Sequence, residues 1–259
     1  MKFRASLLIA LLTVPVAANA QAFRPIIDHV HLAAPDPEKA VAWYRAHFGG
    51  QIMAEARDRL LYGDTRIIFQ KRDANLPSEG SVLDHIGFSV PSVDGAMKAF
   101  QTEGVKITQA VREAPGLFKF AFIEDPWGTR IEVVQDSQKF GLHHVHLRSP
   151  DPAAMQAWLS QQFGGRTAKM KGRLEGIDMS GVWLVVQKGD ATPSAGHAID
   201  HIGFRPVNLE TAVAAMKAHN VKITTEPRPL TLANGTTVQV AFAEGPDGLR
   251  FEMVQRPPE

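Results

Sequence analysis

Apolar and polar residues alternate along several short segments of the chain, which is the pattern of half-buried β-strands. The first such segment is residues 26–33, and a helix with Asp and Pro at its start is predicted over residues 36–48. Three short strands follow and reach residue 71. The same order of strand, helix and three strands returns over residues 83–134. We therefore predict an α+β fold made of βαβββ modules.

This pair of modules is itself repeated in the second half of the chain. Three residues of the first half recur at separations of 115, 116 and 120 residues: His29 as His144, His85 as His201, and Glu132 as Glu252. A near-constant separation over distant segments indicates internal duplication. We predict four modules in two domains, residues 26–136 and 141–256, joined by a short polar linker. Each domain is large enough to bury a core of its own.

The first 20 residues have the pattern of a cleavable signal peptide. Lys2 and Arg4 precede an apolar run over residues 7–16, and Ala18-Asn19-Ala20 is a small-x-small cleavage site. The apolar run is half of the ~20 residues that a membrane-spanning helix needs. We therefore expect cleavage near Ala20 and a periplasmic or secreted protein that is not held in the membrane.

Composition limits the kinds of site and partner that are expected for this chain. A formal net charge of +1 gives no reason to expect a nucleic-acid partner. The chain has no cysteine, which excludes disulfides, thiolate nucleophiles and iron–sulfur clusters. Any metal ion is therefore held by His, Asp, Glu or Gln. We expect a small-molecule substrate and a monomer or homodimer.

Strand alternation brings the candidate ligands to one face of each predicted strand. His29 shares a face with His31, and Glu132 shares a face with Arg130. Two histidines and a carboxylate bind a divalent ion and leave positions open for substrate oxygens or O₂. The predicted ligands are His29, His85, Glu132, His144, His201 and Glu252.

Three motifs resemble those of the vicinal oxygen chelate superfamily: Asp28-His-Val-His-Leu, Asp84-His-Ile-Gly-Phe-Ser-Val, and the segment from Ala121 to Val134. This superfamily includes glyoxalase I, extradiol dioxygenases, methylmalonyl-CoA epimerase, and fosfomycin and bleomycin resistance proteins. The resemblance covers residues 26–256 and implies two glyoxalase-like domains with concave mixed sheets. It also implies a divalent metal ion, which could be Fe, Ni, Zn, Co or Mn.

The resemblance points to a fourth ligand on the strand that carries Gln70, so Gln70 and its counterpart Gln187 are either ligands or neighbours of the site. In this superfamily the sheets close within a domain or are exchanged between domains. One site is then formed either by His29, Gln70, His85 and Glu132, or by His29 and Gln70 with His201 and Glu252. The sequence leaves both arrangements open.

Other polar residues are assigned to the surroundings of the sites. His31 and His146 are expected to line the pocket rather than to bind the metal. Four arginines are expected on the ligand face, where they would bind an anionic substrate, form salt bridges to the ligand glutamates, or turn to water at the rim: Arg130, Arg148, Arg205 and Arg250. Histidines without a counterpart in the other half are expected at the surface or in loops: His47, His143, His197 and His219.

The leading hypothesis is an exported, metal-dependent lyase or isomerase of the glyoxalase or epimerase kind. It would act on a small anionic substrate with two neighbouring oxygens, with Glu132 or Glu252 as a proton carrier. An Fe(II)-dependent dioxygenase is the first alternative. However, extradiol dioxygenases carry a tyrosine where this chain has Phe122 and Phe242. The second alternative is a non-catalytic periplasmic protein that binds a metal or a small toxic compound.

Overall fold

The computed structural model describes residues 22–53, 56–73, 75–232 and 234–257. The predicted signal peptide lies outside these residues. Four modules follow one another. The first has β1 (Phe23–Ala34), α1 (Pro37–Phe48), β2 (Gln51–Met53), β3 (Ala56–Tyr62) and β4 (Thr65–Lys71), and the second has β5 (Leu83–Ser89), α2 (Val93–Thr102), β6 (Lys106–Glu113), β7 (Lys119–Glu124) and β8 (Arg130–Gln135). The predicted α+β fold of βαβββ modules is confirmed.

The second half of the chain has the same order. The third module has β9 (Gly141–Ser149), α3 (Pro152–Phe163), β10 (Arg166–Met170), β11 (Leu174–Met179) and β12 (Val182–Lys188). The fourth has β13 (Ile199–Pro206), α4 (Leu209–Ala218), β14 (Lys222–Thr231), β15 (Thr237–Glu244), the short 3₁₀ helix η2 (Pro246–Gly248) and β16 (Arg250–Gln255). No helix within these described ranges is both long enough and apolar enough to cross a membrane.

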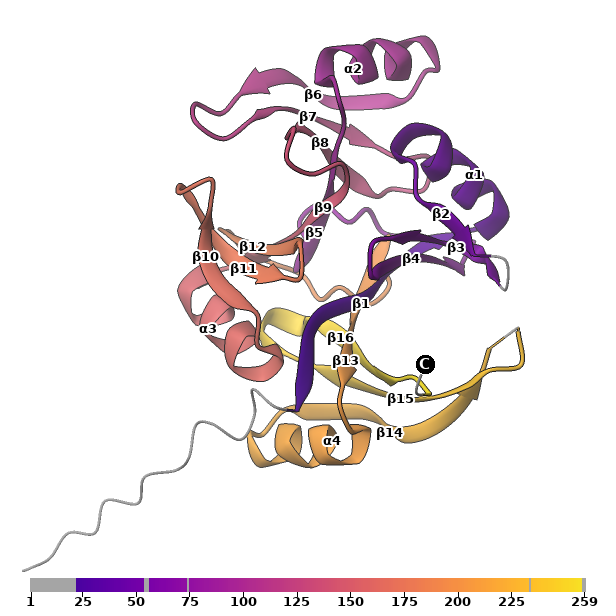
Figure 1. Cartoon of the computed structure of the whole chain (residues 1–259), viewed down its shortest axis with the longest axis vertical. Coiled ribbons are helices and arrows are strands. Elements are labelled where there is room, and N and C mark those ends of the chain that lie inside the picture. The colour runs from indigo at the N-terminus through magenta and orange to yellow at the C-terminus, as the bar shows by residue number, and fades with distance from the viewer. Residues whose placement is uncertain (1–21, 54–55, 74, 233, 258–259) are drawn as a thin grey trace, which may run out of the picture.

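Each of the two sheets combines modules from opposite halves of the chain (Figure 1). The terminal sheet joins the first and fourth modules, in the order β14-β15-β16-β13-β1-β4-β3-β2. The central sheet joins the second and third modules, in the order β10-β11-β12-β9-β5-β8-β7-β6. In the middle of each sheet two first strands run antiparallel, β1 beside β13 and β5 beside β9. Of the two arrangements that the sequence leaves open, the structure has the one in which the sheets form between the halves.

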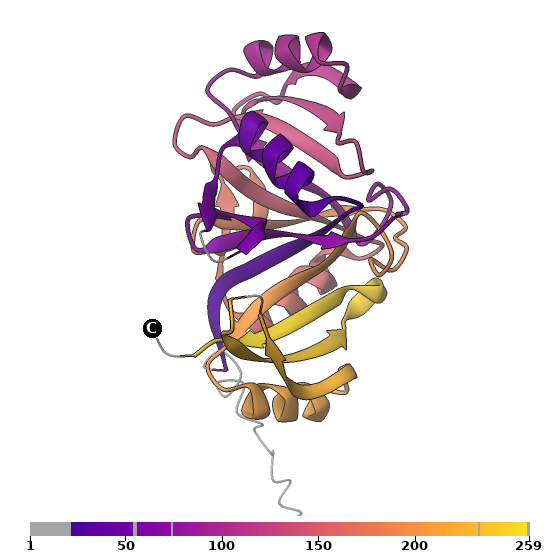
Figure 2. The same cartoon turned by 90° about the vertical axis from the view of Figure 1, so that its right-hand side faces the viewer.

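Helices α1 and α3 lie between the two sheets, while α2 and α4 lie at opposite ends of the molecule (Figures 1 and 2). Phe48 at the end of α1 stacks on Phe88 of β5, with ring centroids 4.3 Å apart. Phe163 at the end of α3 stacks in the same way on Phe204 of β13, at 3.6 Å. Each of these helices therefore packs against a strand of the sheet that does not contain its own module.

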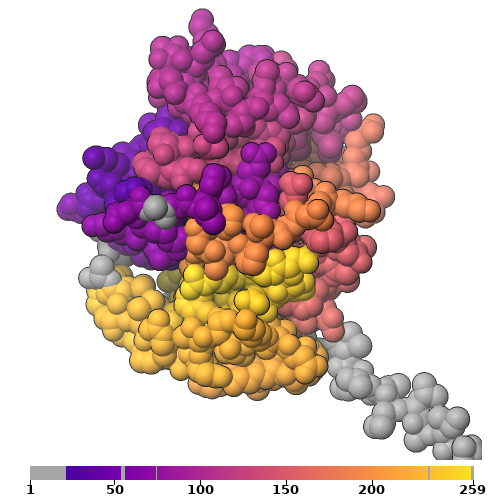
Figure 3. Space-filling model, turned by 180° about the vertical axis from the view of Figure 1, so that it is seen from behind, coloured from indigo at the N-terminus to yellow at the C-terminus, as the bar shows by residue number. Residues whose placement is uncertain are grey.

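Loops also join the halves. The segments that precede β5 and β13 form two isolated parallel bridges, from Leu76 to His197 and from Ser81 to Thr192. The rear face of the molecule shows the purple and orange segments of these loops in direct contact (Figure 3). The two halves are thus joined through sheets, helices and loops, and the residues that carry the chemistry of one half lie beside those of the other.

Candidate metal centres

In both sheets a strand bulges directly before each predicted histidine ligand. The pairing register skips one residue there, namely Asp28 on β1, Asp84 on β5, His143 on β9 and Asp200 on β13. A bulge turns a side chain away from strict alternation. As a result, the skipped residue lies beside the next histidine and not on the opposite face. Each skipped side chain is within hydrogen-bonding distance of that histidine's Nδ1, at 2.7–2.9 Å.

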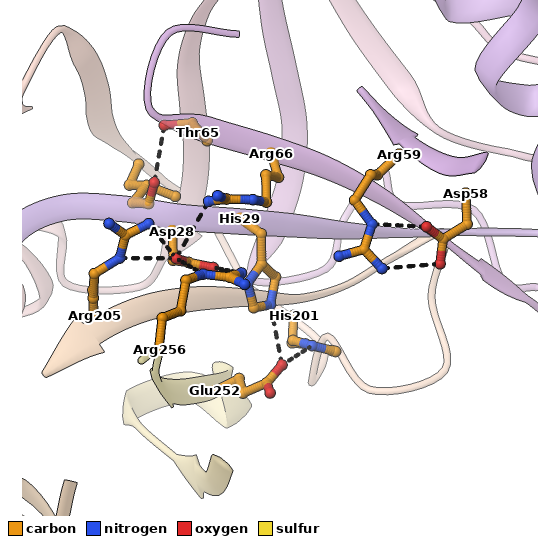
Figure 4. A network of polar contacts seen from close by, with 11 residues as sticks. Asp28, His29, Asp58, Arg59, Thr65, Arg66, His201, Arg205, Glu252 and Arg256 are labelled. Atoms are coloured by element: carbon orange, nitrogen blue, oxygen red, sulfur yellow. Dashed lines mark hydrogen bonds and ion pairs between the residues drawn. The ribbon is translucent and has the colours of Figure 1, made fainter. Parts of the chain in front are cut away.

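The first cluster, here called the β1 centre, consists of His29, His31, His201 and Glu252. Oε2 of Glu252 lies 3.1 Å from Nε2 of His29 and 3.3 Å from Nε2 of His201. Dashed lines mark both contacts in Figure 4. The ring of His31 stacks on that of His201 with centroids 4.3 Å apart. One ligand atom from each of the four residues lies within 4.8 Å of the others. The centre therefore takes residues from β1, β13 and β16.

The second cluster, the β9 centre, consists of His85, Glu132, His144 and His146. Oε2 of Glu132 lies 3.3 Å from Nε2 of His85 and 3.0 Å from Nε2 of His144. Nδ1 of His146 lies 2.9 Å from Nε2 of His85. Both centres thus have three histidines and one glutamate, and both draw ligands from the two halves of the chain.

A glycine makes the close approach of the central strands possible in each centre. Gly203 faces His29 across the β1–β13 pair, and Gly87 faces His144 across the β5–β9 pair. A Cβ atom on Gly203 would lie 2.2 Å from Cε1 of His29, and one on Gly87 would lie 2.0 Å from Cε1 of His144. The repeated Asp-His-Ile-Gly-Phe motif therefore supplies a histidine to the centre and also the space for the histidine of the facing strand.

The strand register places the two glutamines away from the positions that the glutamates occupy. On β8, Glu132 pairs with Gly87, two residues after His85. The matching position on β4 is Ile68, which pairs with His31, and Gln70 lies two residues further along the strand. Gln70 lines the cavity beside the β1 centre.

The third module follows the same rule. Val185 pairs with His146, and Gln187 again lies two residues further along. Modules that carry glutamate have glycine two residues after the first histidine, whereas modules that carry Ile68 or Val185 have a second histidine there. His31 and His146, which we expected to line the pocket, therefore stand within the candidate ligand groups.

Unpaired polar atoms indicate that the clusters fit a cation. Nε2 of His29, Nδ1 of His31 and Nε2 of His144 are buried and make no hydrogen bond to any described residue. Buried polar atoms are almost always paired, and those of His29 and His144 lie 3.1 and 3.0 Å from a glutamate carboxylate. Imidazole and carboxylate groups are ligands of divalent transition metals. The residues present therefore fit one divalent metal ion at each centre.

Protonation within the clusters follows from burial and charge. Burial lowers the pKa of His29, but the adjacent carboxylates of Asp28 and Glu252 outweigh that effect and leave the pKa above its usual value. Burial and the neighbouring histidines lower the pKa of His31 well below the usual value, so this ring is neutral at pH 7. Although burial opposes ionisation, the facing histidines hold the pKa of Glu252 below its usual range. A neutral ring and an ionised carboxylate are the forms that bind metal.

The expected arginines pair with the bulged aspartates and not with the ligand glutamates. Nη1 of Arg130 lies 2.6 Å and Nη1 of Arg148 lies 3.6 Å from Asp84. Arg250 pairs with Asp200, and Arg205 with Asp28. Of these four arginines only Arg250 lines the cavity at the β1 centre.

The sequence reasoning missed the role of these aspartates. A signal was present, because an aspartate directly precedes a predicted ligand histidine at three places in the sequence, at residues 28, 84 and 200. A carboxylate behind a metal-binding histidine fixes its tautomer and makes the ring a better ligand.

The assignment of His143 to the surface is wrong. It is only 2% exposed, and its Nδ1 lies 2.9 Å from Nδ1 of His144. Its Nε2 lies 3.5 Å from Oδ2 of Asp136. His143 occupies the bulge that holds an aspartate in the other three modules, so one ligand histidine is supported by an imidazole instead of a carboxylate. The sequence hides this role because His143 has no histidine counterpart in the other half.

The two centres differ in their surroundings. The β1 centre lies in a cavity of about 560 Å³ with basic side chains around it, including Arg59, Lys71 and Arg228. Beside the β9 centre there is only about 120 Å³, and its walls are mostly apolar. Residues of the β6–β7 loop and the β10 hairpin close over it, among them Phe118 and Met170, which pack together. The β1 centre therefore has the larger and more polar cavity of the two.

Comparison with known proteins gives a family and a fold. A sequence model of the Glyoxalase/Bleomycin resistance protein/Dioxygenase superfamily matches residues 26–133 and 141–253. Glyoxalase I from Zea mays resembles the chain with a TM-score of 0.68 at 18% identity, over 89% of this chain and 92% of that one. A putative dioxygenase from Bacillus subtilis has a TM-score of 0.62 at 15% identity, over 92% of this chain and 87% of that one. A search of curated protein sequences returns no match.

Proposed function

Because the chain belongs to the Glyoxalase/Bleomycin resistance protein/Dioxygenase superfamily, we propose that it is a divalent-metal-dependent enzyme that works at the β1 centre. Its substrate is a small anionic molecule with two neighbouring oxygens. Its reaction is of the lyase or isomerase kind, in which a proton is moved next to a carbonyl group. The metal in that case is Ni, Zn, Co or Mn.

The observation that carries this proposal is the open, basic cavity at one of two otherwise similar centres. Lys71 and Arg228 lie on its rim and form no ion pair with another described residue. Leu230, Leu232 and Val238 give it an apolar wall. A small carboxylate or phosphate with a short apolar body matches these walls, because guanidinium and ammonium groups bind such anions.

The residues of the β1 centre have separable roles. His29, His31, His201 and Glu252 would hold the ion, which supplies Lewis-acid polarisation of the substrate oxygens when bound. Asp28 and Asp200 hold His29 and His201 in position through Nδ1. Glu252 is ionised and would serve as the proton carrier if it left the ion during turnover.

A dioxygenase is the second candidate, and one observation favours it. His29, His201 and Glu252 converge as two imidazoles and one carboxylate, the ligand set of Fe(II) oxygenases. Consumption of O₂ by the iron-loaded protein with a catechol or a 2-oxo acid would support this candidate. Turnover without O₂ would support the lyase or isomerase.

The test is metal content together with proton exchange. Purified protein is loaded with each ion in turn, and its metal is counted by mass spectrometry. Exchange of substrate protons for deuterium is then followed by NMR over a panel of small 2-oxo and 2-hydroxy acids. We expect two equivalents of metal and exchange in the wild type, and loss of one equivalent together with exchange in Glu252→Gln.

Glu132→Gln is the matched control at the β9 centre. It should lose one equivalent of metal and keep the exchange reaction. Exchange that survives in Glu252→Gln but disappears in Glu132→Gln would assign the reaction to the other centre and refute the proposal. If the wild-type protein binds metal and a small molecule but neither exchanges the protons of that molecule nor turns it over, it is a binding protein, the non-catalytic alternative.

We also propose that the protein is exported and cleaved near Ala20, in line with the basic start and apolar run of residues 1–20. Fractionation of expressing bacteria, followed by N-terminal sequencing of the product, tests this. A product outside the cytoplasm that begins near Gln21 is the expected result. An uncleaved cytoplasmic protein would refute it.

A further inference from the structure

Arginines crowd around the single carboxylate that supports His29 (Figure 4). Arg205 and Arg256 each donate two hydrogen bonds to Asp28, at 2.6–3.0 Å. Nη1 of Arg66 lies 3.5 Å from the same carboxylate and, among the described residues, has no hydrogen-bond partner. One bidentate arginine is enough to pair a carboxylate, so the others are not explained by Asp28 alone.

The excess of positive charge is larger when the next strand position is included. Arg24 is the register partner of Arg205 across β1 and β13. Like charges directly opposite each other destabilise a sheet. Burial lowers the pKa of Arg66, and Arg256 and Arg205 lower it further in spite of the attraction of Asp28. Three guanidinium groups therefore surround one carboxylate, and a fourth, that of Arg24, belongs to the register partner of Arg205. The carboxylate of Glu252 is already engaged with two histidines.

Three of these arginines, Arg24, Arg205 and Arg256, border a cavity of about 420 Å³ that opens beside β1 and β16. Its lining is largely polar: Arg24, Arg205, Pro206, Val207, Gln255, Arg256 and Pro257. Arg24 is exposed, and no described residue forms an ion pair with it. Arg205 and Arg256 use Nε and Nη2 on Asp28, which leaves Nη1 of each without a hydrogen bond to the residues that the structure describes. We call this cavity the arginine pocket.

The equivalent place in the central sheet shows that the fold does not require this charge. His143 stands at the bulge where the terminal sheet has Asp28. The residue after the Gly-Phe pair is Ser89 in the central sheet and Arg205 in the terminal sheet. The residue after the last strand is Asp136 in the central sheet and Arg256 in the terminal sheet. In the central sheet the bulge therefore holds a basic residue and the acidic residue follows the last strand, and none of the three positions is an arginine. The charge is therefore a local property of the terminal sheet.

We propose that the arginine pocket is a binding site for a phosphate-type oxyanion, held by Arg24, Arg205 and Arg256. A tetrahedral dianion can accept hydrogen bonds from three guanidinium groups at once, and it would offset the repulsion between Arg24 and Arg205. Arg256 lines both this pocket and the cavity of the β1 centre. The oxyanion is accordingly either a free ion or the phosphate group of a larger molecule.

The test is calorimetric titration of the full protein with inorganic phosphate at constant ionic strength. It is run on metal-loaded protein and on protein freed of metal by a chelator that is then removed. We expect saturable binding in both forms. Binding that disappears on metal removal would place the anion on the metal, and the absence of saturable binding in both forms would leave no site. Either result would overturn the proposal.

Arg24→Gln is the informative variant, because Arg24 is exposed and its loss leaves the pairs of Asp28 intact. We expect phosphate to bind about tenfold more weakly, the loss that follows from one charged hydrogen bond. Arg112→Gln removes an exposed arginine of the central sheet and should change nothing. Equal affinity in the two variants would overturn the proposal. Tighter binding of glycerol phosphate than of inorganic phosphate would identify an organic phosphate as the ligand, and the reverse order a free ion.

Discussion

Replacing Gly203 by alanine should displace His29 and remove one metal ion of two. The added Cβ would lie 2.2 Å from Cε1 and 2.4 Å from Nδ1 of the His29 ring. Carbon atoms that are not bonded to each other approach to about 3.5 Å, so the ring must shift by roughly 1.3 Å. Metal–ligand distances tolerate about 0.2 Å. The shifted ring therefore leaves the ligand set of the β1 centre.

The expected loss of affinity exceeds the roughly ten- to hundredfold effect of removing an outer hydrogen bond to a ligand. The free energy of unfolding should fall by about 1–3 kcal/mol, as for other overpacked sites, which leaves the fold intact. Metal content after dialysis gives the number of bound ions, and competition with a chromophoric chelator gives the metal affinity. Circular dichroism shows separately whether the fold is intact.

Gly87→Ala is the matched variant, because its Cβ would lie 2.0 Å from Cε1 of His144. It should empty the β9 centre and leave the β1 centre loaded. If proton exchange belongs to the β1 centre, it is lost in Gly203→Ala only. Gly203→Ala that keeps two equivalents at wild-type affinity would refute the reasoning, since the space beside His29 would then not be limiting.

Three further predictions concern the surroundings of the centres. Burial raises the pKa of Asp125 to about 6 in spite of hydrogen bonds from Tyr44 and Thr129. The folded state therefore holds this proton more tightly than the unfolded state. As a result, Asp125 favours folding at low pH and lowers the free energy of unfolding by about 3 kcal/mol above pH 6. The difference in unfolding free energy between wild type and Asp125→Asn should therefore change between about pH 4 and 6, and a flat difference in denaturant titrations would contradict this. Asp28→Asn should weaken metal binding at the β1 centre about ten- to hundredfold and leave the β9 centre unchanged in the same chelator competition; equal loss at both would count against a local role. Phe118→Ala should open the apolar cover of the β9 centre, so that a chelator removes its metal faster than in wild type, and should cost about 3–5 kcal/mol of stability; an unchanged removal rate would show that the cover does not limit access.

The sequence predicts the modules well because local rules determine them. Asp36 accepts a hydrogen bond from the backbone N–H of Lys39 at the start of α1, and Gly49 ends the helix with a φ of 72°. Two such signals and strand alternation suffice to place a βαβββ unit. Pairing between modules is different, because any first strand of the repeat can pair with any other by the same pattern. Only the three-dimensional packing selects β1 beside β13.

The candidate ligands were predictable where a residue type recurs at a fixed separation, as with His29 and Glu252. His31 and His146 line the cavities as expected, and they also stand within the candidate ligand groups. Whether Ile68 or Gln70 lies opposite His31 depends on the register between β1 and β4, and a shift of two residues would replace one by the other. Strict alternation also places Asp28 on the opposite face from His29, and only the bulge, which sequence alternation cannot show, brings the two together.

The pairing of modules across the halves makes the short stretch 136–140 a tether and not a boundary between independent units. A chain cut there would give two fragments, neither of which contains a complete ligand set, and mixing them should restore both centres. A single half could also serve alone: if two copies of residues 22–135 paired β1 with β5 of the twin, each centre would receive His29 and His31 from one copy and His85 and Glu132 from the other. The present chain thus has, within one polypeptide, the arrangement that a symmetric dimer of such halves would have. Because the two halves differ in sequence, the two centres differ as well, one in an open, basic cavity and one beneath an apolar cover.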